Sequence, residues 1–204
     1  MFGLGSVGIV LVALVVLTLY KGIKIVPQGY KWIVQRLGRY HQTLEPGLNF
    51  IIPFVDNVAY KITTKDIVLD IPSQEVITRD NVVIIANAVA YINIVHPERA
   101  VYGIEDYEQG IRNLVQTSLR SIVGEMDLDS ALSSRDQIKA QLKNAISEDI
   151  ADWGITLKTV EIQDITPSAT MQMAMEEQAA AERQRRAAVT RADGQKQAAV
   201  MEAE

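Results

Sequence analysis

Side chains that could act as a nucleophile, a base or a metal ligand are few and far apart in this sequence. The chain has no cysteine and only two histidines, His41 and His96, which lie in different segments. The lack of cysteine excludes thiolate nucleophiles and zinc–thiolate sites. The serines lie outside any G-x-S-x-G context, and a serine nucleophile needs a base within hydrogen-bond reach. The serines considered are Ser118, Ser121, Ser133 and Ser134. We therefore predict no catalytic residue.

Two further patterns are associated with metals or cofactors, but both lack the required context. Asp127 and Asp129 have a D-x-D spacing, which is more often a pair of solvated loop and helix-cap residues than a metal site. The first eight residues contain G-x-G-x-x-G, a dinucleotide-binding pattern that needs a preceding strand and an acidic residue about 20 positions later. No strand fits before Gly3, and the first acidic residue is Glu45. We expect no metal and no cofactor.

The stretch from Phe2 to Tyr20 has no charged residue. As a helix rising about 1.5 Å per residue it would be roughly 28 Å long, close to the hydrocarbon thickness of a bilayer. A cleaved signal peptide would need a positive region before the apolar run and a small-residue cleavage site, and the sequence shows neither. A buried core helix is seldom this long without a polar face. We predict a transmembrane helix, marked by Phe2, Gly8, Leu14 and Tyr20.

The flanking charge predicts the orientation of this helix. Basic residues follow it closely, and before it lies only the α-amine. These residues are Lys21, Lys24, Lys31, Arg36 and Arg39. The positive-inside rule then places the N-terminus outside and the rest of the chain in the cytoplasm. The net charge is −5 and the acidic and basic residues are interspersed, so we expect no nucleic-acid partner.

Residues 27–95 are predicted to form a mostly antiparallel β unit after a membrane and juxtamembrane segment, residues 1–26. Tyr30–Leu37 alternates as a strand, and Val82–Val95 is long and β-branched. Lys61–Ile71 is predicted as one strand ended by Pro72, with a further short strand over Gln74–Thr78. Before Lys61 lies an apolar segment, Leu48–Val58, which is broken by Pro53 and is either a core contact or a patch that dips into the bilayer. Its apolar residues are Leu48, Phe50, Ile51, Ile52 and Phe54.

Residues 96–165 are predicted as an α+β unit. Pro97 suits the first turn of a short helix, and Asp106–Val123 has one apolar stripe typical of a longer one. Ser134 and Gln137 have the spacing of a capping box at the start of another helix, which Gly154 ends. Ile155–Ile165 is a predicted strand that could pair with the first sheet.

Residues 166–204 are predicted as a long helix capped by Thr166 with Pro167 in its first turn. An 11-residue repeat aligns Glu182–Ala192 with the segment from Asp193, and this period keeps one seam facing a neighbouring helix. The seam consists of Ala181, Ala188, Val189, Ala192, Ala199, Val200 and Ala203. A solitary charged helix is the alternative, because such small residues bury little surface each. Many parallel copies would gain by repetition, which favours a multimer.

The sequence blocks resemble the SPFH (band-7) family of stomatins, prohibitins and flotillins, and most closely its bacterial stomatin-type members. The blocks are VPQGYKWIVQRLGRYHQTLEPGLNFIIPFVDNV, ITRDNVVIIANAVAYINIV, QTSLRSIVGEMDLDSALSSRD and WGITLKTVEIQDITP, followed by the alanine-rich tail. The resemblance implies a two-part SPFH domain, divided near His96, whose first part sits on or partly in the membrane. It also implies large rings or cages of many copies at the inner (plasma) membrane of a bacterium.

The function expected from this resemblance is a membrane scaffold. Its copies would enclose a membrane microdomain, organise lipids and proteins, and modulate the access of a membrane-anchored AAA protease; a small NfeD-type membrane protein is a further expected partner. A dedicated regulatory subunit of one protease or channel is the alternative. A membrane-anchored hydrolase is a third, opposed by the missing catalytic context.

Overall fold

The computed structural model of the chain describes residues 16–17 and 20–202. Phe2, Gly8 and Leu14 of the predicted span lie outside the described residues, so the span stays a prediction. Tyr20, its last residue, is helical and 80% exposed. Within the described residues, no helix has the length and hydropathy needed to cross a membrane.

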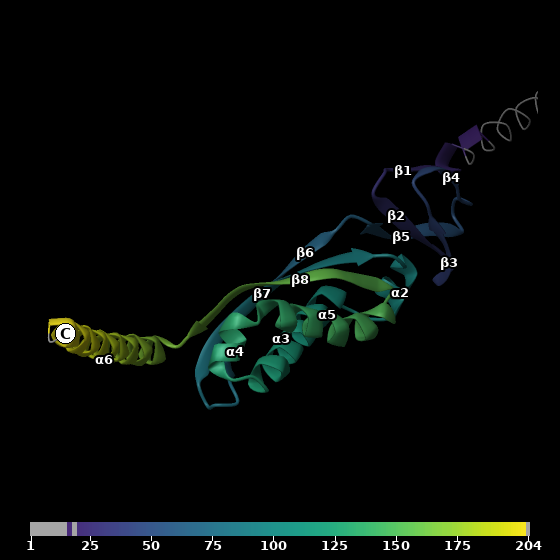
Figure 1. Cartoon of the computed structure of the whole chain (residues 1–204). Helices are drawn as coiled ribbons and strands as arrows, with labels where there is room; N and C mark the ends of the chain where they lie inside the picture. Colours follow the sequence, from purple (N-terminus) through teal and green to yellow (C-terminus); the bar gives the residue numbers. More distant parts are fainter. Residues whose placement is uncertain (1–15, 18–19, 203–204) are drawn as a thin grey trace, which may run out of the picture.

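The described residues form three antiparallel sheets, with strand orders β1-β4, β3-β2-β5 and β6-β7-β8. The first two sheets lie next to the helix that ends at Gly22, and the third continues away from them (Figure 1). The strands are β1 (Ile23–Val26), β2 (Tyr30–Arg36), β3 (Arg39–Leu44), β4 (Gly47–Phe50), β5 (Asp56–Thr63), β6 (Ile67–Ile77), β7 (Val83–Ile94) and β8 (Ile155–Pro167).

Helices cover one face of the β6-β7-β8 sheet, as Figure 1 shows. They are α2 (Pro97–Tyr102), α3 (Tyr107–Gly124), α4 (Leu128–Ser133) and α5 (Arg135–Ala151). The alternation of β7 explains this arrangement, because its even-numbered residues from Ile84 to Ile94 are all buried. Ala86, Ala88 and Ala90 are small enough for the helices to approach closely.

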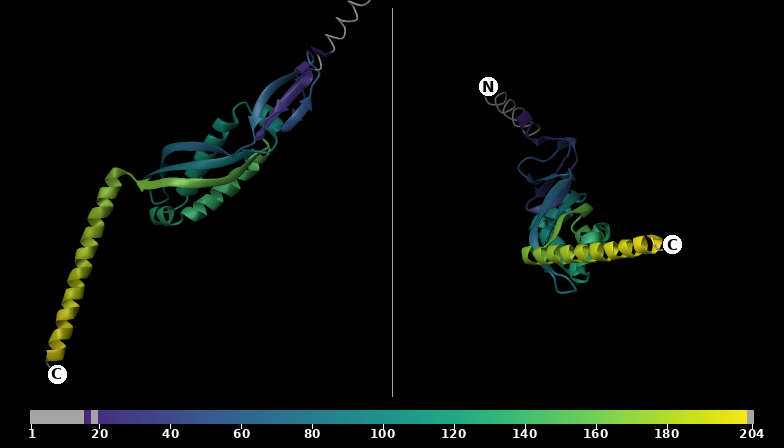
Figure 2. Two further views of the ribbon diagram at one scale, coloured as in Figure 1. Left: turned by 90° about the horizontal axis from the view of Figure 1, so that it is seen from above. Right: turned by 60° about the vertical axis from the view of Figure 1, so that its left-hand side comes forward.

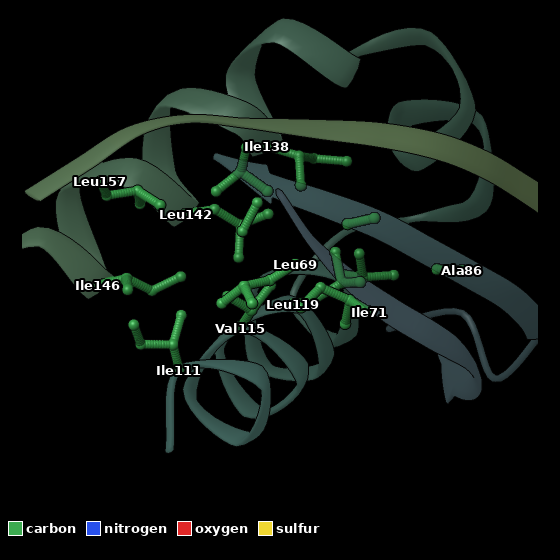
Figure 3. Close-up of a cluster of buried hydrophobic side chains, with 14 of the residues drawn as sticks. Leu69, Ile71, Ala86, Ile111, Val115, Leu119, Ile138, Leu142, Ile146 and Leu157 are labelled. Carbon is green, nitrogen blue, oxygen red and sulfur yellow. The ribbon is translucent and has the colours of Figure 1, made fainter. Parts of the chain in front are cut away.

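The core between the sheet and its helices is large and continuous (Figure 3). Leu69 and Ile71 of β6 meet Ile111, Val115 and Leu119 of α3. From the other side α5 contributes an apolar stripe, spaced at three to four residues. Its fully buried members are Ile138, Leu142, Ile146 and Ile150.

Three predicted helix ends are confirmed, but the capping box predicted at one of them is wrong. The Asp106 side chain caps α3 by accepting a hydrogen bond from the Gln109 N–H, 2.9 Å away. Gly154 follows α5 with a φ of 69°, a left-handed conformation that glycine adopts without strain. Ser134, however, makes no side-chain capping bond. Its φ and ψ of −109° and 42° follow from the end of α4, a short helix that the sequence pattern did not predict.

Three predicted boundaries are also wrong. Lys61–Ile71 is not one strand, since β5 ends at Thr63 and β6 begins at Ile67. Pro72 does not end β6, because a register shift between Ile71 and Gln74 absorbs it; β6 is an edge strand, where a bulge can accommodate proline. Thr166 and Pro167 do not start the last helix, because both pair with β7 in the sheet.

The long helix α6 runs from Ala169 to Glu202 and leaves the domain at the far end from β1–β5 (Figure 2). At 1.5 Å per residue its 34 residues are about 51 Å long. The structure thus confirms an α+β fold with antiparallel sheets and a long C-terminal helix. The predicted division near His96 stays a prediction; strands from both sides of it share the β6-β7-β8 sheet.

Candidate membrane-contact surface and assembly helix

The few residues suited to catalysis are not gathered into a site. His41 lies on β3, and His96 precedes α2 with its Nδ1 3.6 Å from Glu98. Ser133 donates to the Asp129 carbonyl oxygen, and no hydrogen bond among the described residues joins a serine to either histidine. The Nε and Nη2 atoms of Arg79 both donate to the Asp127 carboxylate. Within the described part of the chain, no group of three or more potential metal ligands occurs.

An exposed apolar face lies on the ribbon formed by β1 and β4. Ile23 is paired with Phe50, and Ile25 with Leu48. Directly opposed residues of antiparallel strands point to the same side, so these four side chains share one face. Their exposed fractions are 40%, 65%, 70% and 62% respectively. The predicted patch therefore gains Ile23 and Ile25, which the alternation Ile-Lys-Ile after the charged boundary could have indicated.

Two turns beside this ribbon extend its apolar character. Leu37 and Phe54 are 84% and 79% exposed, and both have positive φ, at 50° and 73°. The Leu37 N–H donates to the Val55 carbonyl oxygen, which joins the two turns. A non-glycine residue in this conformation costs roughly 1–2 kcal/mol. Neither side chain gains burial within the chain, so the exposure calls for a partner outside it.

We refer to the exposed residues of the ribbon and its turns as the apolar surface. It comprises Ile23, Ile25, Leu37, Leu48, Phe50, Ile52 and Phe54. The prediction that Ile51 belongs to the same patch is wrong. Ile51 is only 8% exposed and packs inward against Val26, Val34 and Leu44. Strand alternation explains this, because Ile51 points away from the face that Phe50 and Ile52 occupy.

An ion pair between the partly exposed Arg36 and the buried Asp56 carboxylate holds the loop that carries Ile52 and Phe54. Arg36 donates from Nε and Nη2 to the two carboxylate oxygens of Asp56, at 2.7 and 3.0 Å. Asp56 also accepts from the Ile52 N–H at 2.9 Å. The Arg36 hydrogen bond is the main cause that lowers the pKa of Asp56 from 3.8 to about 2. No local sequence pattern indicates this pair, because it depends on the pairing of β2 with β5.

The end of the N-terminal helix is attached directly to this loop. The Ile51 N–H donates to the Gly22 carbonyl oxygen at 2.8 Å. A Cβ atom at Gly22 would lie 2.7 Å from the Ile51 carbonyl oxygen, so the approach requires glycine. Lys21 lies with its Nζ 5.8 Å from the centre of the Phe54 ring. The helix end, the loop and the apolar surface thus form one connected structure.

The helix α6 has almost no buried face beyond its first turns. Met171 and Met175 pack against the large core, but the predicted seam residues Ala181, Ala188 and Val189 are exposed, as is Ala192. Ala199 and Val200 are helical, and nothing is described of their side chains; Ala203 lies outside the described residues. Glu182 binds Arg185 and Arg186 at helix-neighbour spacing.

The exposed apolar surface around the β1-β4 ribbon and the long exposed helix α6 thus lie at opposite ends of the α+β domain (Figure 2). Residues 24–196 match the family described as SPFH domain / Band 7. The match covers most of the chain, and the chain belongs to this family.

Several curated proteins are similar along most of this chain. An uncharacterized protein of Archaeoglobus fulgidus is 41% identical over 190 residues, which cover 93% of this chain and 76% of that protein. An uncharacterized protein of Methanothermobacter thermautotrophicus is 41% identical over 191 residues, 93% of this chain and 60% of the relative. Stomatin-like protein 2, mitochondrial, of Homo sapiens is 38% identical over 175 residues, 86% of this chain and 49% of that protein. The chain therefore spans between about half and three quarters of the length of these relatives.

Proposed function

We propose that this protein is a membrane-anchored SPFH scaffold, many copies of which form a ring or cage around a patch of membrane. In this role it organises lipids and membrane proteins and limits the access of a membrane-anchored AAA protease, with an NfeD-type protein as a further partner. Its role is non-enzymatic. The observation that carries the proposal is the apolar surface, which adjoins the end of the N-terminal helix.

The size of the apolar surface supports the bilayer as its partner. Full burial of one large apolar side chain contributes about 1.5–3 kcal/mol, and seven such residues are exposed together. Lys21 lies beside them, with its Nζ 5.8 Å from the centre of the Phe54 ring, where its ammonium group can reach lipid headgroups. The ribbon would therefore lie against the cytoplasmic leaflet, with the chain oriented as the flanking charge predicts.

A tryptophan placed on the ribbon tests this contact in the full chain reconstituted into vesicles. Phe50→Trp, with both native tryptophans replaced by phenylalanine, should be strongly quenched by lipids brominated on their acyl chains. Val68→Trp, at a 58% exposed position on β6, is the matched control and should be quenched little. Equal quenching at the two positions would remove the bilayer from the proposal.

The assembly is tested through the seam of α6. Val189→Asp with Val200→Asp should leave membrane insertion intact and abolish the large particle, as seen by electron microscopy of detergent-extracted protein. Thr190→Asp introduces one carboxylate on another side of the helix, where the Thr190 hydroxyl donates to the Arg186 carbonyl oxygen. This control should assemble normally. Full-size particles from the double variant would show that the contact between copies lies elsewhere. Wild-type protein that yields only monomers would refute the scaffold itself.

A further inference from the structure

A groove of about 410 Å³ separates the first turns of α6 from the body of the domain. Its apolar lining is Val82, Leu128, Met171 and Met175. The two methionines rest on the large core, while the next turns of α6 diverge from it. The groove is therefore built at the point where the assembly helix leaves the domain (Figure 2).

The charged lining of the groove is entirely acidic. Asp80, Asp127, Asp129 and Glu182 surround the apolar residues, and none of the described lining residues is basic. Hydrogen bonds from the Thr78 hydroxyl, and to a smaller extent from the Leu128 N–H, hold the pKa of Asp80 below its ordinary value. An occupant with an apolar stem and a cationic head, as in arginine, matches both linings.

The basic residues of α6 fall into two groups with different orientations. Arg185 and Arg186 bind Glu182 of their own helix. Successive helical residues are about 100° apart, so Arg191 lies on the side opposite Met171, Met175 and Glu182. Arg183 lies about 100° around the helix from Glu182, and its Nε donates to the Ala179 carbonyl oxygen of its own helix at 3.1 Å. Both arginines are exposed. The groove and these arginines are thus placed on different sides of the same helix.

Such an arrangement suits a front-to-back contact between copies. A surface that meets a different surface of the next copy generates rings or open chains, whereas a self-complementary surface generates a closed dimer. Arg183 follows Glu182 directly and is therefore level with the outer end of the groove. Glu176 and Glu177, earlier on α6, would be repelled by the acidic lining, so the contact selects a register.

We propose that the groove beside α6 receives Arg183 of the neighbouring copy, and that this contact sets the register of adjacent copies in the assembly. The inference rests on the proposed scaffold, since it assigns one of the contacts between its copies. The apolar lining would cover the stem of the arginine, and Asp129 would receive its guanidinium group.

Charge reversal tests the contact, with the full chain extracted in detergent and its particle size measured by light scattering and electron microscopy. Arg183→Glu and Asp129→Arg should each cause a severalfold loss of the large particle. The combination of the two restores opposite charges and should recover most of it. Asp149→Arg, at an exposed site on α5 outside the groove, is the control and should assemble like the wild type.

The outcomes separate this inference from the proposed function. Assembly of both single variants at the wild-type level, or a combined variant no better than the worse single one, would overturn the arginine contact and leave the scaffold standing. Equal loss in the Asp149→Arg control would overturn it too, since net charge would then explain the effect. Wild-type protein without any large particle would refute the scaffold and the contact together.

Discussion

The two folded parts of this chain bury their apolar residues to very different extents. The β6-β7-β8 sheet and its helices enclose a core whose sheet strands and helices all contribute fully buried residues. The β1–β5 part encloses a small core of four buried residues, Val26, Val34, Leu44 and Ile51. It leaves a larger set of apolar side chains exposed. The large core stabilises the first part, whereas the second part leaves an apolar face uncovered within the chain.

The difference follows from the secondary structure of each part. A sheet with amphipathic helices on one face has two apolar layers to bring together. The β1-β4 ribbon has only two strands, and an isolated two-stranded ribbon is at best marginally stable in water. One face of the ribbon packs inward through Val26, and the other has nothing within the chain to cover it. The bilayer, next to the N-terminal helix, supplies the missing layer in the proposed arrangement.

The largest expected effect comes from truncating a leucine in each part. Leu142→Ala removes a fully buried side chain from the large core and should lower the free energy of unfolding by about 2–5 kcal/mol. Leu48→Ala is the matched control at a 62% exposed position, where the change should stay within about 0.5 kcal/mol. Denaturant unfolding of the detergent-solubilised chain measures both. A Leu48→Ala cost as large as that of Leu142→Ala would refute the contrast.

The chain contains a natural reporter for each part. Its two tryptophans are Trp32, which packs against the small core, and Trp153, which packs against the large one. Replacing one of them with phenylalanine leaves the fluorescence of the other to follow the unfolding of its own part. Leu142→Ala should therefore shift the Trp153 transition to lower denaturant, and by more than it shifts the Trp32 transition.

Breaking the Arg36–Asp56 pair should have the next largest effect, on the β1–β5 part. Arg36→Ala leaves the largely buried Asp56 carboxylate without its main partner, which destabilises the loop that carries Ile52 and Phe54. The Trp32 transition should shift to lower denaturant, while the Trp153 transition shifts less. Arg39→Ala, at an exposed position in the same hairpin, is the control. Equal shifts of both transitions would show that the two parts unfold as one.

Acid should reproduce the effect of Arg36→Ala in the wild-type chain. The pKa of Asp56 is lower in the folded chain than the ordinary value, so the folded state binds the proton less readily than the unfolded state. The pair therefore contributes its full stability above pH 3.8 and loses it as the pH falls from 3.8 to about 2. The Trp32 transition should lose this pH dependence in Arg36→Ala. A dependence unchanged by the substitution would assign it to other carboxylates.

The sequence predicts the interior of the large domain better than the surface of the small one. The alternation of β7 and the apolar spacing of α5 are local patterns, and the isoleucines and leucine that they identify are buried, although Ala145, which the same α5 spacing includes, is exposed. The face formed by Ile25 and Leu48 instead depends on the pairing of β1 with β4, which no local pattern records. The sequence likewise groups Ile51 with its exposed neighbours Phe50 and Ile52, although its side chain points to the opposite side.

The smallest expected effect concerns the junction of the two parts. The Tyr102 hydroxyl of α2 accepts a hydrogen bond from Gln35 of β2 at 2.9 Å, and its ring makes edge contacts with Tyr40 and Tyr60. Tyr102→Phe keeps the ring and removes the exposed hydrogen bond, which should cost less than about 1 kcal/mol. Tyr102→Ala also removes the aromatic contacts and should separate the Trp32 and Trp153 transitions further. If both variants leave the two transitions as far apart as in the wild type, this aromatic cluster does not couple the β1–β5 part to the large domain.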